Sequence, residues 1–159
     1  MLLNLIKYKN NWLSLQYIIF WQMKEYFTLK EFLKSNTAKA HNIDNTPTFA
    51  IVANLQRLSK FILTPTRYRY GKPIIVTSGY RCFELNTLVG GVKNSQHLNG
   101  CAADLVCADM QTLFNLLRTN EYVDQLLYES NGKTKWIHVS IANNGKLPRH
   151  NIIDNYKVK

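Results

Sequence analysis

The sequence predicts a single α+β domain in which helices flank a small antiparallel sheet. Three observations lead to this fold class. Apolar residues recur at helical spacing between Phe49 and Ile62, β-branched strands follow from Pro73 onward, and turn residues separate the later strands. The chain has 159 residues, of which 46% are hydrophobic, enough for one domain with its own core.

Two helices are expected first. Thr28 and Glu31 have the spacing of a capping box, which predicts a short helix to about Ser35, followed by a polar loop over 35–45. A second helix is expected from Thr46-Pro47 to Pro65, because proline suits the first helical turn and disrupts later ones. Its buried face is predicted to consist of Phe49, Val52, Leu55, Leu58 and Ile62.

The rest of the chain alternates strands and short helices. We expect strands at 73–78, 101–107, 125–129 and 136–141, with a last short strand at 152–153. The first of these is expected to be buried. Helices are expected at 84–89 and, capped by Asp109, at 109–120. The strands at 125–129 and 136–141 pair naturally as a hairpin around Asn131-Gly132.

The domain signals begin only after residue 26. Residues 1–26 are therefore predicted to be an N-terminal extension of uncertain role, and residues 27–159 a single domain. The apolar run at 12–21 is too short to span a bilayer and lacks a small-residue cleavage site, so neither a signal peptide nor stable membrane insertion is expected. An alternative is that Met23 is the true start. We expect cytoplasmic synthesis and a monomer.

The chain is strongly basic and contains three cysteines. Its net charge of +10 favours polyanionic partners, namely nucleic acid, anionic lipid or anionic cell wall, and charge alone does not choose among them. No zinc-finger spacing or other nucleic-acid recognition motif accompanies the charge, so no nucleic-acid partner is expected. The odd number of cysteines, with no CxxC pair, argues against a disulfide framework.

Three residues stand out against apolar or loop surroundings. Asp104 interrupts the apolar strand CAADLVC, where a buried carboxylate needs a compensating cation or donors. His97 lies seven residues earlier, across Gly100, which permits a tight turn back toward the strand. His138 lies in WIHVS, and strand alternation places it on the same face as Trp136. Each residue alone has an ordinary structural explanation.

Together, these residues offer two imidazoles and one carboxylate, a set that suits zinc. Three protein ligands leave a fourth position for water, as in catalytic zinc sites. A general base is needed nearby, and Glu129 at the end of the neighbouring strand is our choice, with Asp124 in reserve. Arg81 could stabilise an oxyanion or bind a carboxylate. A solvated Glu129 and a surface Arg81 are the structural alternatives.

Three motifs carry a family resemblance. They are TSGYRCFELN at 77–86, SQHLNGCAAD at 95–104 and WIHVS at 136–140. In this order they resemble the zinc D-Ala-D-Ala carboxypeptidases, whose superfamily includes phage L-alanyl-D-glutamate endolysins and the Hedgehog domain. The resemblance covers about residues 27–140 and implies the same α+β fold. It also implies one zinc ion per chain, held by His97, Asp104 and His138.

The resemblance assigns further roles. Arg81 would bind the substrate or the transition state, and Ser95 and Gln96 would line the substrate cleft. In better-known members an acidic base stands three residues before the last histidine, a position that Lys135 occupies here. Either Glu129 supplies the carboxylate, as in a shorter phage-like branch of the family, or catalysis is weak.

The implied function is a zinc metallopeptidase that hydrolyses bonds involving D-amino acids in peptidoglycan stem peptides. It would act at the cell wall as a carboxypeptidase or endopeptidase, in the manner of a phage endolysin or of a host enzyme. The alternative is a catalytically weak or inactive module of the same fold that binds cell wall in a zinc-dependent way.

Overall fold

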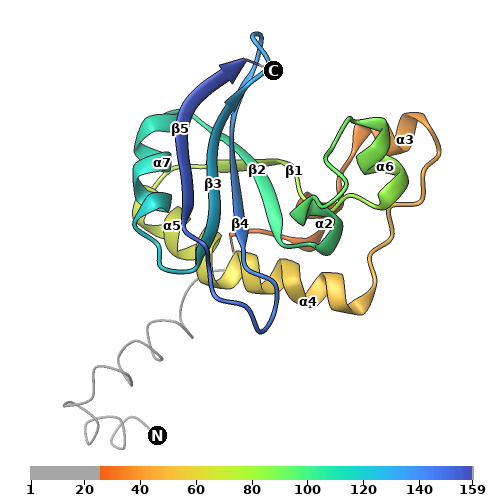
Figure 1. Cartoon of the computed structure of the whole chain (residues 1–159), viewed down its shortest axis with the longest axis horizontal. Coiled ribbons are helices and arrows are strands. Elements are labelled where there is room, and N and C mark those ends of the chain that lie inside the picture. Colours follow the sequence, from red (N-terminus) through yellow and green to blue (C-terminus); the bar gives the residue numbers. More distant parts are fainter. Residues whose placement is uncertain (1–25, 159) are drawn as a thin grey trace, which may run out of the picture.

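The computed structural model describes residues 26–158 as a five-stranded sheet with helices around it (Figure 1). The predicted α+β class is confirmed. The helices are α2 (Leu29–Leu33), α3 (Asn36–Ala40), α4 (Phe49–Leu58), α5 (Thr64–Tyr70), α6 (Phe83–Leu88) and α7 (Met110–Arg118). The strands are β1 (Ile74–Ser78), β2 (Ala102–Cys107), β3 (Val123–Ser130), β4 (Lys135–Ile141) and β5 (Asn151–Val158). A π-helical turn, η2 (Ser59–Leu63), joins α4 to α5, and a 3-10 turn, η3 (Gln96–Asn99), precedes β2.

The sheet has the strand order β1-β2-β4-β3-β5. The first four strands pair antiparallel as predicted, whereas β5 pairs parallel with β3. The reason is the position of the chain at the end of β4, where Ile141 lies opposite Val123 at the start of β3. A strand that begins there and runs along the free edge of β3 must run in the direction of β3.

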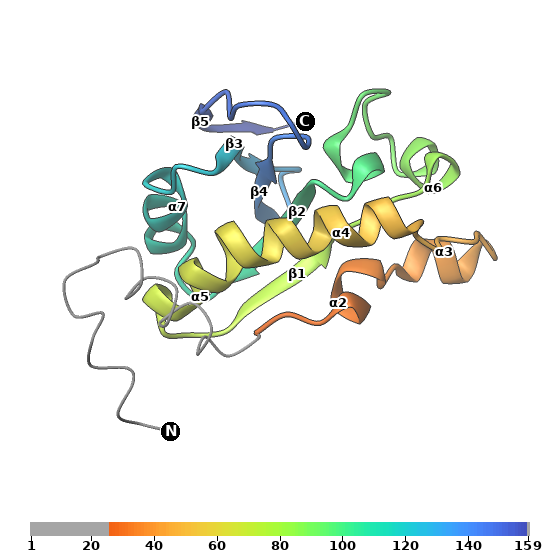
Figure 2. The same cartoon turned by 90° about the horizontal axis from the view of Figure 1, so that it is seen from below.

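Two groups of helices lie at opposite sides of the sheet. Helices α5 and α7 lie at one side and α2, α3 and α6 at the other in both Figure 1 and Figure 2. Helix α4 runs beneath the strand ends in Figure 1 and passes in front of them in Figure 2.

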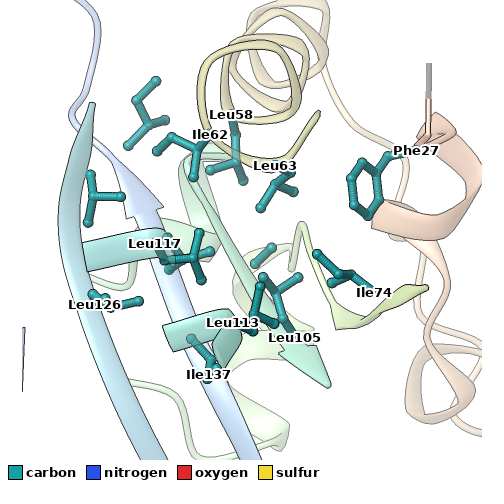
Figure 3. Close-up of a cluster of buried hydrophobic side chains, with 14 of the residues drawn as sticks. Phe27, Leu58, Ile62, Leu63, Ile74, Leu105, Leu113, Leu117, Leu126 and Ile137 are labelled. Carbon is teal, nitrogen blue, oxygen red and sulfur yellow. The ribbon is translucent and has the colours of Figure 1, made fainter. Parts of the chain in front are cut away.

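The core forms between one face of the sheet, helix α7 and the long α4–η2 segment (Figure 3). Fully buried aliphatic side chains from these elements meet there, and they include Leu58, Ile62, Leu105, Leu113, Leu117, Leu126 and Ile137. Each such burial stabilises the fold by about 1.5–3 kcal/mol. These contacts form the rigid core that supports the strands and helices carrying the site residues.

The first helix has the predicted cap, but the loop after it was predicted wrongly. The backbone N–H of Thr28 donates to Glu31 Oε2 at 2.7 Å, which confirms the capping box. The predicted loop at 35–45 contains α3, because Ser35 Oγ accepts a hydrogen bond from Ala38 N and caps a second short helix.

The second helix starts later and extends farther than predicted. Thr48 is its N-cap, and Phe49 is 89% exposed instead of buried. The helical course does not end at Pro65, which stands in the first turn of α5. Because the nitrogen of Pro65 carries no hydrogen, the carbonyl of Phe61, four residues earlier, has no helical N–H to bond with. Asn120 Nδ2 donates to that carbonyl at 3.0 Å and replaces the lost bond.

The remaining predicted elements are present, with a difference in the burial of β1 and with a last strand, β5, that is longer than the predicted 152–153. Helices α6 and α7, strand β2 and the β3–β4 hairpin all form, and Asp109 caps α7 by accepting from Thr112 N at 3.0 Å. Strand β1 was predicted to be buried but lies at the edge of the sheet, so that Ile75 is 58% exposed.

Among residues 26–158, no helix combines the length and apolar character needed to cross a bilayer. The predicted N-terminal extension lies outside the described residues, except for Tyr26. The apolar run at 12–21 and the alternative start at Met23 also lie outside them.

Candidate metal centre

Asp104 and His138 face each other across neighbouring strands. They are a direct antiparallel pair in the β2–β4 register, so their side chains project from the same face of the sheet. Ile137 and Val139 project from the other face into the core. The alternation predicted for β4 is therefore confirmed, and the core packing of its odd-numbered residues fixes where His138 points.

His97 approaches from the 3-10 turn η3. Ser95 caps this turn, with its Oγ accepting from His97 N at 3.3 Å, and Gly100 ends it at a φ of +67°. A Cβ atom at Gly100 would lie 2.7 Å from the Ile51 carbonyl oxygen on α4. Glycine is thus required there by both conformation and space, as the turn into β2 demands.

The three potential ligand atoms form a compact triangle. His138 Nδ1 lies 3.0 Å from Asp104 Oδ1, and His97 Nε2 lies 3.2 Å from each of these atoms. Ligands at about 2.0–2.1 Å from a tetrahedral zinc ion are separated by roughly 3.3 Å. Among the described residues, this is the group of histidine, cysteine and acidic side chains that could hold a metal ion. The donor set and its spacing fit zinc.

A backbone carbonyl orients His97. Its Nδ1 lies 2.6 Å from the Gly79 oxygen, so Nδ1 carries the proton and donates, which leaves the Nε2 lone pair directed at the triangle. Sequence reasoning did not assign a role to Gly79. A Cβ atom there would lie 2.4 Å from the Phe32 carbonyl oxygen, so only glycine allows the chain to run this close to α2.

The electrostatics of the triangle favour the protonation states that bind metal. Burial lowers the pKa of His97, and the nearby Asp104 only partly opposes this, so the imidazole is neutral at pH 7. Burial alone would raise the pKa of Asp104, but positive charge and donated hydrogen bonds from the neighbouring imidazoles, His97 foremost, outweigh burial when those rings carry protons and hold that pKa far below its usual value. Asp104 is therefore a carboxylate at pH 7. A neutral imidazole beside a carboxylate is the state that a divalent cation requires.

Arg81 lies at the edge of the triangle. Its guanidinium Nη2 is 3.5 Å from Asp104 Oδ2, and its backbone N–H donates to the His97 carbonyl at 3.2 Å. Burial lowers the pKa of Arg81, while Asp104 and Glu129 raise it. Arginine is nevertheless cationic at every physiological pH. The structural alternative of a surface arginine does not apply, since the side chain is only 16% exposed.

Glu129 lies on the same face, farther along the sheet. It pairs with Trp136 across the β3–β4 hairpin, and Trp136 Nε1 donates to Glu129 Oε2 at 3.0 Å. Because Trp136 and His138 are two residues apart on β4, Glu129 is a diagonal neighbour of His138. The Cα atoms of diagonal neighbours lie about 7–8 Å apart. Lys135 is three residues from His138 on a regular strand, so it projects from the opposite face.

Two other predicted residues are engaged elsewhere. The reserve base Asp124 accepts hydrogen bonds from Gln96 and Arg149. Gln96, for which a place in the substrate cleft is a prediction, directs its amide at Asp124, the Ile141 carbonyl and Arg149. Nothing in the local sequence indicated the partnership with Arg149, which lies 53 residues away in the chain.

A search among curated proteins found no match. The family model of Peptidase M15 matches residues 25–140, a span that contains β1 to β3, β4 up to its last residue but one, and all three residues of the triangle. M15 peptidases are zinc-dependent, in agreement with the ligand set. The resemblance inferred from the three sequence motifs is confirmed by this match over well more than half of the chain, and the chain belongs to the peptidase M15 family.

Proposed function

We propose that the chain is a zinc metallopeptidase that hydrolyses peptide bonds involving D-amino acids in peptidoglycan stem peptides. One observation carries the proposal most. The triangle of His97, Asp104 and His138 shares its face of the sheet with Glu129, and Arg81 lies beside it. The proposal is supported by this grouping of potential metal ligands, a carboxylate and a buried guanidinium.

The proposed ligands are His97 Nε2, Asp104 Oδ1 and His138 Nδ1. Zinc bound in this way supplies a Lewis acid that polarises a peptide carbonyl and lowers the pKa of a water molecule. Glu129 accepts the proton that the attacking water loses and then delivers a proton to the leaving amine. The Trp136 indole holds Oε2 of that carboxylate by its hydrogen bond and so fixes the direction from which the proton is received.

Arg81 supplies positive charge at a place fixed by its buried side chain. Its guanidinium either stabilises the oxyanion that develops at the scissile carbonyl or binds a carboxylate of the substrate. Its backbone bond to the His97 carbonyl ties its position to that of the ligand loop. The peptidoglycan substrate is supported by the motif resemblance and by the net charge of +10, which suits an anionic wall.

Digestion of purified peptidoglycan tests this function. We expect the zinc-loaded full chain to release new amino termini, and mass spectrometry of the muropeptides then shows which bond is cut. The variant Glu129→Gln keeps the size of the side chain but cannot accept the proton. It should retain zinc and lose about 10²–10⁴-fold in rate.

The control is Glu121→Gln, which makes the same chemical change at an exposed position and should cleave at the wild-type rate. Full activity of Glu129→Gln would refute the assignment of the base. Zinc binding by wild type without any cleavage would instead support the alternative, a zinc-dependent wall-binding module.

A further inference from the structure

A second polar cluster includes the first residue of η3, the turn that carries His97. It consists of Gln96, Asp124 and Arg149. Asp124 is the second residue of β3, and Arg149 lies in the loop that connects β4 to β5. Arg149 Nε lies 3.1 Å from both Asp124 oxygens, and Arg149 N donates to Asp124 Oδ1 at 2.8 Å. Gln96 Nε2 donates to Asp124 Oδ2 at 3.0 Å, and Gln96 Oε1 accepts from Arg149 Nη2 at 3.2 Å.

The cluster is closed around a buried charge. The Asp124 side chain is only 4% exposed, whereas that of Arg149 is 60% exposed. Burial opposes ionisation of Asp124, but the hydrogen bonds from Arg149 and Gln96 outweigh it and hold the pKa of this carboxyl below its usual value. Asp124 is therefore a carboxylate whose acceptor sites are directed at these two partners. This arrangement fits a fixed link between chain segments better than it fits a proton acceptor in catalysis.

Gln96 connects this cluster to the metal centre, because it is the residue directly before His97. Its side-chain amide also donates to the Ile141 carbonyl at 3.1 Å, and its backbone carbonyl accepts from Cys101 N at 3.0 Å. Through this one residue the start of η3 is tied to β3, to the end of β4 and to Cys101, the residue that precedes β2. The polar atoms of the Gln96 amide are directed at β3, the end of β4 and Arg149.

We propose that Asp124 and Arg149 are positioning residues of the metal centre, which act through Gln96 to hold His97 in the geometry that zinc requires. Metal–ligand distances tolerate only about 0.2 Å, so the loop that carries His97 needs a rigid support. The inference rests on the proposed zinc site. It extends that site beyond residue 140, where the family match ends, to the loop that carries Arg149.

Zinc affinity of the full chain distinguishes positioning from simple stabilisation. Arg149→Gln removes the guanidinium that contacts Asp124 and Gln96. We expect the zinc dissociation constant to rise about 10-fold or more, as measured by competition with a chromogenic chelator. Arg118→Gln is the matched control, because Arg118 is exposed at the end of α7, and it should bind zinc like wild type. Thermal unfolding without zinc reports separately on stability.

Two further variants exclude a trivial loss of folding. Arg149→Lys keeps the charge but cannot contact Asp124 and Gln96 in the same way, so we expect an intermediate affinity. Gln96→Leu removes the connecting amide and should weaken zinc binding as much as Arg149→Gln does. The effects of the two variants should not add when they are combined, because both break the same link.

The proposal is overturned if Arg149→Gln and Gln96→Leu bind zinc within twofold of wild type, even when they are less stable. It is also overturned if Gln96→Leu changes only KM for the substrate, as a residue that lines the cleft would. Failure of the proposed function looks different, because wild type itself would then bind no zinc or cleave no peptide.

Discussion

Two aspartates of the same sheet, Asp104 in β2 and Asp124 in β3, are both largely shielded from solvent, but their partners differ. Asp124 receives the guanidinium of Arg149 through contacts of 3.1 Å to each oxygen, together with the amide of Gln96. Asp104 lies among two imidazoles at 3.0 and 3.2 Å, and its cation, Arg81, is no nearer than 3.5 Å. The charge of Asp124 is neutralised by Arg149, whereas the charge of Asp104 is only partly compensated by Arg81.

This difference separates a structural carboxylate from a potential metal ligand. A buried carboxylate is stable when a fixed cation and donors satisfy it, and Asp124 meets this condition within the chain. Asp104 instead shares its oxygen Oδ1 with two nitrogen atoms that can themselves bind metal. The spacing of the three atoms leaves a position for a cation that completes the charge balance. Three experiments sharpen this contrast.

The largest expected effect comes from Asp104→Asn. Loss of the anionic ligand should raise the zinc dissociation constant by more than about 100-fold, beyond the range for residues that only hold a ligand in place. Asp124→Asn should raise it about 10-fold. Chelator competition on both full-length variants measures this, and equal losses in the two would erase the distinction between ligand and support.

A smaller effect concerns stability and pH. Asp124→Asn should lower the free energy of unfolding of the zinc-free protein by about 2 kcal/mol at pH 7, since charge-assisted bonds to a buried group are lost. The pKa of Asp124 is depressed in the folded state, so the wild-type advantage is present above about pH 4, the unfolded value, and is lost as pH falls through the lower folded pKa. Urea unfolding at several pH values measures it. A difference that stays constant down to about pH 2 would contradict the assignment.

The smallest effect is expected for Thr77→Val. Thr77 Oγ1 donates to the Asp104 backbone carbonyl at 3.1 Å, an exposed bond between β1 and β2. Its loss should cost about 1 kcal/mol or less and leave zinc affinity within about twofold of wild type. A large loss of affinity would mean that β1 also positions Asp104. Asp104 would then depend on a supporting residue, as we propose for His97.

Several parts of the fold followed from local sequence signals. The capping box at Thr28, the cap at Asp109 and the Asn131-Gly132 turn act over a few residues, and each forms as predicted. Helix α3 was missed although its cap at Ser35 is also local. The error at Pro65 has a distant partner: the amide of Asn120 donates to the Phe61 carbonyl, which Pro65 leaves without its helical donor. Neither the spacing nor the residue types around Pro65 indicate this bond.

The sequence by itself determined which side chains are available for chemistry and roughly where each one lies. His97, Asp104 and His138 stood out because polar groups interrupt apolar or turn patterns, and Gly100 marked the bend between two of them. These signals depend only on neighbouring residues, so they can be recognised from the sequence without the structure.

Only the tertiary structure decided how these residues meet. The register of β2 and β4 pairs Asp104 with His138, and the close passage of the chain at Gly79 supplies the carbonyl that orients His97. The same structure pairs Asp124 with Arg149. Such contacts join segments 18 to 41 residues apart, and they are fixed by the packing of the core between them, which no local pattern encodes.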